Sequence, residues 1–318
     1  MSFVILIIGF ALLIKGADIF VDGAASIAKY FNVPAMIIGL TIVAMGTSAP
    51  EAAVSITSSL AGQNDMSVAN VVGSNFFNVL IVLGISAVMC HLPVEKNTIK
   101  KDAPFLILVS ALLLLFGFNL NISRIEGLIL LAVFVYFLVD TVKTGKKSVE
   151  ESSASYDEAA IAINNESVDE ISIPKTILVS IVGIVGIVIG GDLVVNSATK
   201  IALTLGMSDN LVGLTIVAIG TSLPELVTSI VAIKKGENDI AIGNVIGSNL
   251  FNILLVLGLA TTINPITISG LAFTDLIFMN VITIMLYLFM KKDYSLVKKH
   301  GYILMSSYVL YMAYTIVR

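Results

Sequence analysis

The sequence predicts an all-α membrane protein with ten transmembrane helices, arranged as two inverted-topology five-helix repeats. Three observations lead to this prediction: long apolar blocks, an internal repeat at one constant spacing, and an odd number of blocks in each copy. Of the 318 residues, 57% are hydrophobic and only 13% are charged, whereas soluble domains carry roughly 25% charged residues. Mean hydropathy is +1.00. Apolar blocks of about 18 residues or more are typical of spans, because roughly 20 helical residues cross the hydrocarbon layer.

Ten apolar blocks are candidate spans. They cover about residues 3–28, 34–60, 67–90, 103–120, 124–142, 173–199, 208–233, 240–263, 270–290 and 300–317. One long polar stretch separates the fifth block from the sixth. We therefore expect a first repeat at 1–142, a cytoplasmic acidic linker at 143–172 and a second repeat at 173–318. The composition of the linker is typical of a flexible, solvated segment. A cation-sensing loop is the alternative, but the linker has no Asp-x-Asp-x-Asp-Gly pattern to support it.

The distribution of lysine and arginine predicts the orientation in a cell membrane. With the N-terminus assigned to the first face, that face receives three basic residues: Arg124, Lys200 and Arg318. The opposite face receives fourteen: Lys29, Lys96, Lys100, Lys101, Lys143, Lys146, Lys147, Lys175, Lys234, Lys235, Lys291, Lys292, Lys298 and Lys299. Because basic residues favour the cytoplasmic side, we expect both termini outside (extracellular or periplasmic) and the linker in the cytosol.

The chain repeats itself at an offset of 174 residues. GLTIVAMGTS at 39–48 returns as GLTIVAIGTS at 213–222, with nine of ten positions identical. NVVGSNFFNVLIVLG at 70–84 returns as NVIGSNLFNILLVLG at 244–258, with eleven of fifteen identical. With five spans in each copy, the second copy must enter the membrane from the opposite side. Inverted repeats of this kind place a substrate site at mid-membrane, where broken helices meet.

The motif Gly-Thr-Ser-x-Pro-Glu lies in the middle of the second span of each repeat, at 46–51 and at 220–225. Pro50 and Pro224 lack the N–H that a helix needs at that point, so each predicts a break in its helix. Freed carbonyls there must face protein or a wet cavity. They lie at the C-terminal end of a half-helix, which favours cations. The alternative is a capping box that only restarts the helix.

Glu51 and Glu225 are the central candidate residues. An ionised carboxylate in the middle of an apolar span costs several kcal/mol unless it is paired, protonated or coordinated. No lysine or arginine lies at a comparable depth in the second, third, seventh or eighth span. A transported cation is therefore the expected partner. Two carboxylates with several neutral oxygens suit calcium, which takes about six to eight oxygen ligands, although sodium ions or protons could use the same oxygens.

The third span of each repeat supplies a polar stripe. Residues 70, 74 and 78 share one helix face at i, i+4 and i+8, and the second copy repeats them at 244, 248 and 252. The candidate ligands among these are Ser74, Asn78, Ser248 and Asn252. The alternative is that these side chains only join helices to one another. Asp18 and Asp192 also recur, and we expect them to fix helix ends or line a vestibule. Lys15, one turn before Asp18, is a possible partner for it.

At these motifs the sequence resembles the cation/calcium exchanger superfamily, specifically its prokaryotic sodium/calcium exchangers. The resemblance runs over nearly the whole chain. It implies that spans two, three, seven and eight form the ion-binding core, with spans one and six sliding across it. It also implies that Glu51 and Glu225 bind calcium and sodium in competition, and that the carbonyls of Thr47 and Thr221 join the calcium site. The flanking sodium sites would use Ser48, Ser222, Ser74, Ser248 and the carbonyls of Ala44 and Ala218.

One position departs from some relatives, which have aspartate where this chain has Asn252. In potassium-dependent relatives an aspartate there is tied to potassium transport, so we expect potassium-independent exchange of sodium for calcium. The resemblance also implies alternating access and more than two sodium ions per calcium ion, so we expect exchange to be electrogenic. A proton/calcium or other divalent-cation antiporter is the nearest alternative, and a cation channel is a second. We expect no enzyme activity, no cofactor beyond the transported ions and no nucleic-acid partner. Besides these ions the expected partner is the lipid bilayer, and a monomer is compatible with the sequence.

Overall fold

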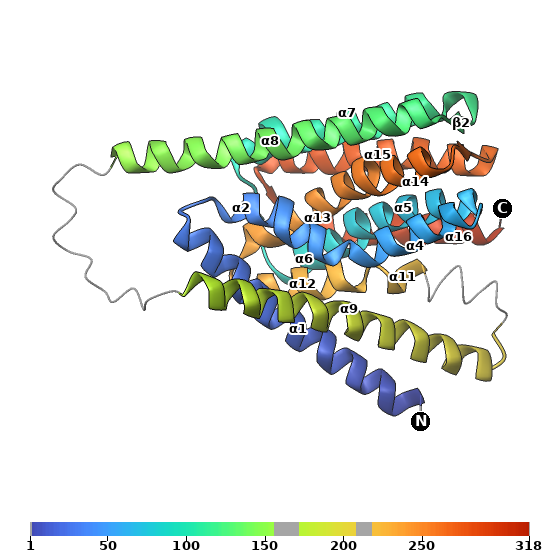
Figure 1. The fold of residues 1–318 in the computed structure, drawn as a ribbon, viewed down its shortest axis with the longest axis horizontal. Helices are drawn as coiled ribbons and strands as arrows, with labels where there is room; N and C mark the ends of the chain where they lie inside the picture. Colours follow the sequence, from blue (N-terminus) through green and yellow to red (C-terminus); the bar gives the residue numbers. More distant parts are fainter. Residues whose placement is uncertain (1, 156–171, 208–217, 318) are drawn as a thin grey trace.

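The computed structural model describes residues 2–155, 172–207 and 218–317, which form a bundle of helices (Figure 1). The helices are α1 Ser2–Tyr30, α2 Ala35–Ile38, α3 Ala44–Thr47, α4 Ala49–Leu60, α5 Asn64–Phe77, α6 Leu83–Met89, α7 Ala103–Phe116, α8 Arg124–Ser155, α9 Ile173–Thr204, α11 Ala218–Gly220, α12 Leu223–Lys234, α13 Asn238–Phe251, α14 Gly258–Ile263, α15 Gly270–Asp293 and α16 Lys298–Val317. Wider π-helical turns lie at Gly39–Val43, Asn78–Val82, Thr98–Asp102 and Asn252–Leu257, and a 3-10 turn at Gly117–Asn119. Most of the described chain is therefore helical, as predicted.

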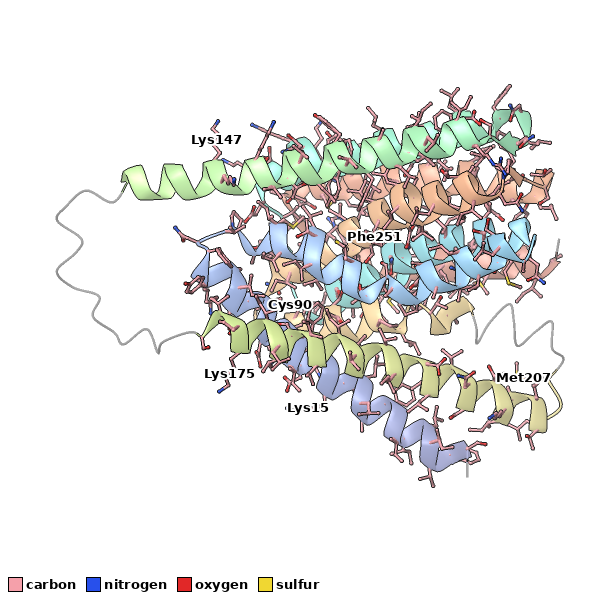
Figure 2. The ribbon with its side chains drawn as sticks, viewed as in Figure 1. Lys15, Cys90, Lys147, Lys175, Met207 and Phe251 are labelled. Carbon is pink, nitrogen blue, oxygen red and sulfur yellow. The ribbon has the colours of Figure 1, made fainter. Side chains whose placement is uncertain are left out.

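Seven helical segments of the described residues are long and apolar enough to span a membrane, and the bent pair of helices at 35–60 would make an eighth. Two of them form the core: 94% of the most apolar window of Asn238–Ile263 is buried, and 78% of that of Met66–Met89. In the other five the buried share is between 28% and 39%. These outer helices turn apolar side chains away from the bundle (Figure 2), as lipid-facing helices do. The count of ten spans stays a prediction.

The fifth expected span is longer than the sequence pattern indicated. α8 runs from Arg124 to Ser155 and so continues thirteen residues past 142 into the expected linker (155 − 142 = 13). Those added residues are mostly lysine, glutamate and serine with one glycine, Gly145, and no proline, so little in them opposes a helix. The end of the apolar block at 142 therefore did not mark the end of the helix. Residues 156–171 of the linker lie outside the described part.

The offset of 174 residues found in the sequence recurs in the backbone. A left-handed backbone conformation occurs at Leu120, with φ 59°, and at Tyr294, with φ 50° (294 − 120 = 174). It occurs again at Gly62, with φ 75°, and at Gly236, with φ 79° (236 − 62 = 174). Bulky residues such as leucine and tyrosine rarely adopt positive φ. The two halves therefore share unusual turns as well as sequence.

Two short antiparallel sheets each join one half of the chain to the other. β1 Leu92–Pro93 pairs with β4 Ser295–Leu296, and β2 Asn121–Ile122 pairs with β3 Ile266–Thr267. β1 and β3 are separated by 174 residues, as are β2 and β4 (266 − 92 and 295 − 121). Each strand thus pairs with a strand that is not its own counterpart. This exchange of partners is the pattern that a twofold relation between the halves would produce.

α1 and α9 lie side by side and run in opposite directions (Figure 1). Their contact is made through glycines, because a Cβ on Gly16 would lie 2.7 Å from the Ile187 nitrogen and 2.8 Å from the Gly183 carbonyl oxygen. A Cβ on Gly190 would lie 2.5 Å from the Leu13 nitrogen. Small residues at such crossings let two helix backbones touch. α1 and α9 therefore pack backbone to backbone.

Candidate cation-binding site

A break in the helix places Glu51 at the start of α4. The helices on either side of Ser48 are bent by 50°, and Ser48 itself has φ −84° and ψ 7°. Pro50 stands in the first turn of α4, where its missing N–H costs nothing because that group would have no partner inside the helix. Glu51 lies in the same turn, at the electropositive end of α4. The predicted break is therefore present, and it is also a helix start.

The second half repeats this geometry at α12. Ser222 has φ −92° and ψ 6°, Pro224 stands in the first turn of α12, and Glu225 lies in that turn. Of the helix that precedes the break, the structure describes α11, Ala218–Gly220. The first part of the expected seventh span, 208–217, lies outside the described residues. Within the described part, the two glutamates thus occupy equivalent places in two equivalent helices.

Both glutamate side chains are fully buried, and each is bonded by a serine from the opposite half. Ser48 Oγ donates to Glu225 Oε1 at 2.9 Å, and Ser222 Oγ donates to Glu51 Oε1 at 3.0 Å. A serine of the same half adds a second bond: Ser74 Oγ lies 3.1 Å from Glu51 Oε1, and Ser248 Oγ 3.5 Å from Glu225 Oε1. The structure therefore brings the six predicted side chains together in one crossed arrangement.

Several buried oxygens of this arrangement receive no hydrogen bond from the described residues. They are the second carboxylate oxygens, Glu51 Oε2 and Glu225 Oε2, the amide oxygens Asn78 Oδ1 and Asn252 Oδ1, and the hydroxyl Thr221 Oγ1. Each such group costs about 1–3 kcal/mol when it is left unpaired. Among the described residues, no lysine or arginine lies within ion-pair distance of either glutamate. Hard oxygen acceptors with no donor are suited to sodium or calcium.

Thr47 and Ala44 take part in holding the break. Thr47 Oγ1 donates to Asn244 Oδ1 at 3.0 Å and lies 3.2 Å from the Val43 carbonyl oxygen. The Ala44 carbonyl accepts the Ser48 N–H at 3.0 Å and also lies 3.4 Å from Thr47 Oγ1. The Thr47 hydroxyl is thus used within the protein, and only its carbonyl remains for the ligand role that the family resemblance implies.

Two asparagines fix the backbone of the glutamates. Asn70 Nδ2 donates to the Glu51 carbonyl oxygen at 3.1 Å and to Ser55 Oγ at 2.9 Å. In the second half, Asn244 Nδ2 lies 3.4 Å from the Glu225 carbonyl oxygen and 3.1 Å from the hydroxyl of residue 229. The serines at 55 and 229 were not predicted. The same offset of 174 would have identified them, since both are serines inside apolar helices.

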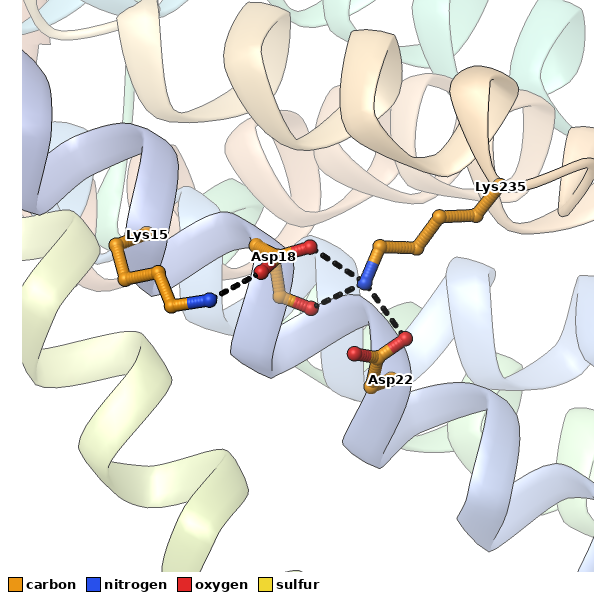
Figure 3. Close-up of polar contacts among 4 residues, drawn as sticks. All are labelled: Lys15, Asp18, Asp22 and Lys235. Atoms are coloured by element: carbon orange, nitrogen blue, oxygen red, sulfur yellow. Dashed lines mark hydrogen bonds and ion pairs between the residues drawn. The ribbon is translucent and has the colours of Figure 1, made fainter.

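Asp18 lies outside the glutamate arrangement, in an ion-pair cluster shown in Figure 3. Lys235 Nζ is 2.6 Å from Asp18 Oδ1 and 2.6 Å from Asp22 Oδ1, and Lys15 Nζ is 2.7 Å from Asp18 Oδ2. The expected Lys15–Asp18 pair is present. The cluster fixes α1 to the C-terminal end of α12, in agreement with the expectation that Asp18 fixes helix ends. Asp192 is exposed on α9.

Comparison with known proteins gives one consistent family. The model of the sodium/calcium exchanger protein family matches residues 1–142 and 175–317. A protein named putative antiporter CaxA, from Alkalimonas amylolytica, is 44% identical over an alignment that covers 85% of this chain and 83% of the relative. The sodium/calcium exchanger MaX1 of Methanosarcina acetivorans is 33% identical, with 98% of this chain and 97% of the relative covered.

Solved structures agree with this result. The sodium-calcium exchanger NCX_Mj, soaked with zero Na⁺ and Ca²⁺, matches with a TM-score of 0.85 at 31% identity, and the match covers 99% of this chain and 98% of that chain. The same protein soaked with 2.5 mM Na⁺ and 0.1 mM Ca²⁺ matches with a TM-score of 0.84. The chain is a multi-pass membrane protein and belongs to the sodium/calcium exchanger family.

Proposed function

We propose that this protein is a secondary active antiporter that exchanges sodium for calcium by alternating access. The observation that carries the proposal is the crossed pairing of Ser48 with Glu225 and of Ser222 with Glu51, which gathers two carboxylates in a fully buried place. One oxygen of each carboxylate is held by serines and the other accepts no bond from described residues. Carboxylates arranged in this way are prepared to receive cations.

The chemistry of the oxygens supports competition between the two ions. One calcium ion neutralises two carboxylates, as do two sodium ions. If more than two sodium ions bind per calcium ion, as the family resemblance implies, each cycle moves net charge and exchange is electrogenic. In this proposal calcium binds Glu51, Glu225 and the carbonyls of Thr47 and Thr221, with the amide oxygens of Asn78 and Asn252 nearby. Flanking sodium ions use Ser48, Ser222, Ser74, Ser248 and the carbonyls of Ala44 and Ala218.

Asn252 supports potassium-independent exchange rather than proton exchange. An amide neither ionises nor carries a proton in the way an aspartate would, so the site has two carboxylates and not three. Asn252 is fully buried and its Oδ1 accepts no bond from described residues, so it can act as a neutral ligand. A cycle that passes protons through this position is therefore disfavoured.

The arrangement of the helices supports ten spans in two inverted repeats. α1 begins and α16 ends at one end of the bundle, while α8 ends and α9 begins at the other (Figure 1). Most of the lysines belong to that second end, so we propose a cytoplasmic linker and termini outside. The exchanged partners of β1 and β4, and of β2 and β3, fit two halves inserted in opposite directions.

The test is calcium uptake into proteoliposomes that contain the purified protein. The sodium gradient, the pH gradient and the membrane potential are each varied while the other two are clamped. The proposal expects uptake driven by outward sodium at clamped pH, faster when the potential favours net charge movement, and unchanged when potassium is replaced by choline. Uptake that follows only the pH gradient would establish the proton/calcium alternative instead. Conduction of calcium without counterflow would establish a channel.

A further inference from the structure

We propose that Asn75 and Asn249 are positioning residues, each of which sets the orientation of a ligand amide in the opposite half of the protein. Asn75 orients Asn252, and Asn249 orients Asn78, so that the amide oxygens of Asn78 and Asn252 are left for the transported cation. This inference rests on the proposed function, because it concerns how that cation site is completed.

The contacts between the two central helices carry the proposal. Asn252 Nδ2 donates to Asn75 Oδ1 at 3.1 Å, and Asn78 Nδ2 donates to Asn249 Oδ1 at 3.2 Å. Asn252 Nδ2 also lies 3.1 Å from Ser74 Oγ. All four asparagines are buried, and in both ligand amides the nitrogen is bonded while the oxygen accepts nothing from the described residues. Both amides are therefore held with the nitrogen bonded to protein and the oxygen left free of described donors.

An asparagine amide can turn by half a rotation and exchange its oxygen for its nitrogen at almost no cost in shape. For a cation ligand the two orientations are opposite in effect, because one presents a lone pair and the other presents N–H donors. A neighbour that can only accept removes this ambiguity. Asn75 Oδ1 is such a neighbour for Asn252. If the Asn252 amide turned, its oxygen would face the Asn75 oxygen and the hydrogen bond between them would be lost.

The orienting asparagines are themselves fixed by main-chain groups, which cannot turn. Asn75 Nδ2 lies 3.5 Å from the Asn249 carbonyl oxygen, and Asn249 Nδ2 lies 3.5 Å from the Asn75 carbonyl oxygen. Asn75 Nδ2 also lies 3.6 Å from Met279 Sδ, a weak acceptor. In each series of contacts a backbone carbonyl holds the orienting amide, which holds the ligand amide, whose oxygen is left for the cation. The orienting amide and the ligand amide belong to opposite halves of the protein.

Because each orienting asparagine contacts one ligand amide of the opposite half, double-mutant cycles can test the proposal. They use the full-length protein in proteoliposomes and in detergent. The variants are Asn75→Leu, which has similar volume but no acceptor, Asn252→Ala, and the pair of both. The readouts are calcium binding to the purified protein and the calcium KM and maximal rate of exchange. If Asn75 acts through Asn252, Asn75→Leu raises the calcium Kd roughly tenfold, the value of one lost ligand contact. It then has no further effect once Asn252 is alanine.

The matched control combines Asn75→Leu with a change in the ligand amide that Asn75 does not orient. Asn78 lies about one helical turn from Asn75, yet its amide is held by Asn249. Asn75→Leu and Asn78→Ala should therefore have additive effects. The equivalent cycle in the other half, Asn249→Leu with Asn78→Ala, should couple as the first one does. The proposal is supported if the changes couple in the pairs Asn75–Asn252 and Asn249–Asn78. The changes must also be additive in the control pairs Asn75–Asn78 and Asn249–Asn252.

Three other results overturn it. Additive effects in all four cycles would mean that the orienting asparagines act on general stability alone. Equal coupling in all four would mean that the amides form one undifferentiated network. Loss of folding in both leucine variants, detected as aggregation in detergent, would assign Asn75 and Asn249 a purely structural role. Failure of the proposed exchange is a separate outcome: wild-type protein would then bind calcium without sodium-driven uptake, and the binding cycles would still be measurable.

Discussion

Replacing Glu51 by glutamine changes both the charge and the chemistry of the site. Glu51 Oε1 accepts bonds from Ser222 and Ser74 at 3.0 and 3.1 Å, while Oε2 accepts none from the described residues. A glutamine oxygen can keep both serine bonds, so its NH₂ group takes the place of Oε2 and presents donors to the cation. The variant should therefore fold and keep the shape of the site, yet lose cation binding.

The expected loss depends on the charge of the ion. Two unit charges about 4 Å apart interact by about 4 kcal/mol at an effective dielectric constant near 20. Removing one carboxylate charge thus costs about 4 kcal/mol for sodium and about 8 kcal/mol for calcium. Since about 1.4 kcal/mol is a factor of ten in affinity, sodium binding falls by about three orders of magnitude and calcium binding by more than five. Calcium exchange should be undetectable.

The assay measures calcium and sodium binding to the purified Glu51→Gln protein, and sodium-driven calcium uptake in proteoliposomes. Glu225→Gln should behave in the same way, because its contacts mirror those of Glu51. The control is Glu126→Gln, a matched change at a carboxylate that bonds Ser123 at the start of α8 and, among the described residues, lies outside the glutamate arrangement. Wild-type calcium flux in Glu51→Gln, or a loss no larger for calcium than for sodium, would refute the reasoning.

Three further changes test other parts of the structure. Ser48→Ala removes a bond to the buried Glu225 carboxylate worth about 1.5–3 kcal/mol, so the calcium KM should rise roughly 10- to 150-fold; an unchanged KM contradicts the crossed arrangement. Gly16→Ala places a Cβ 2.7 Å from a backbone nitrogen of α9 and should cost about 1–3 kcal/mol in unfolding free energy, whereas Gly270→Ala, which meets nothing within 4 Å, should not. Burial lowers the pKa of Lys235, but its two aspartate partners raise it, and the net value is above the usual one. Lys235→Met should therefore cost about 1 kcal/mol of stability at neutral pH. On the alkaline side this difference is lost as the pH rises beyond about 10.4; a difference that disappears between about pH 6 and 8 would contradict this.

The sequence predicted that Glu51 and Glu225 stand at equivalent helix breaks because the two halves carry the same uncommon residues at one offset. A carboxylate in an apolar helix needs a partner, and the prolines showed where each helix must break, so Glu51 and Glu225 could be singled out without coordinates. What the pattern could not show is the exchange of partners. Which serine bonds which carboxylate depends on how the halves face each other, and the crossed Ser48–Glu225 and Ser222–Glu51 pairs come from packing alone.

Other features escaped prediction for specific physical reasons. The π-helical turns after Asn78 and Asn252 leave no signature in an apolar run. The extension of α8 to Ser155 was missed because hydropathy indicates which residues prefer an apolar environment, and polar residues after 142 can remain helical. The contact of Lys235 with Asp18 joins residues 217 positions apart, and no periodicity within one helix predicts such a pair.

The ion-pair cluster of Lys235 joins α1 to α12, and not all of its residues recur at the offset between the two halves. At the offset of 174, Lys235 corresponds to Ala61 and Asp22 to Asn196, so no equivalent ion-pair cluster joins the first helix of the second half to the rest of the described chain. In the proposed cycle, two identical halves would leave the inward-facing and outward-facing resting forms equally populated. If the cluster forms in only one of these two forms, an attachment worth about 1 kcal/mol favours that form by about fivefold. The empty carrier would then have a preferred resting orientation, fixed by a lysine that never touches the ions.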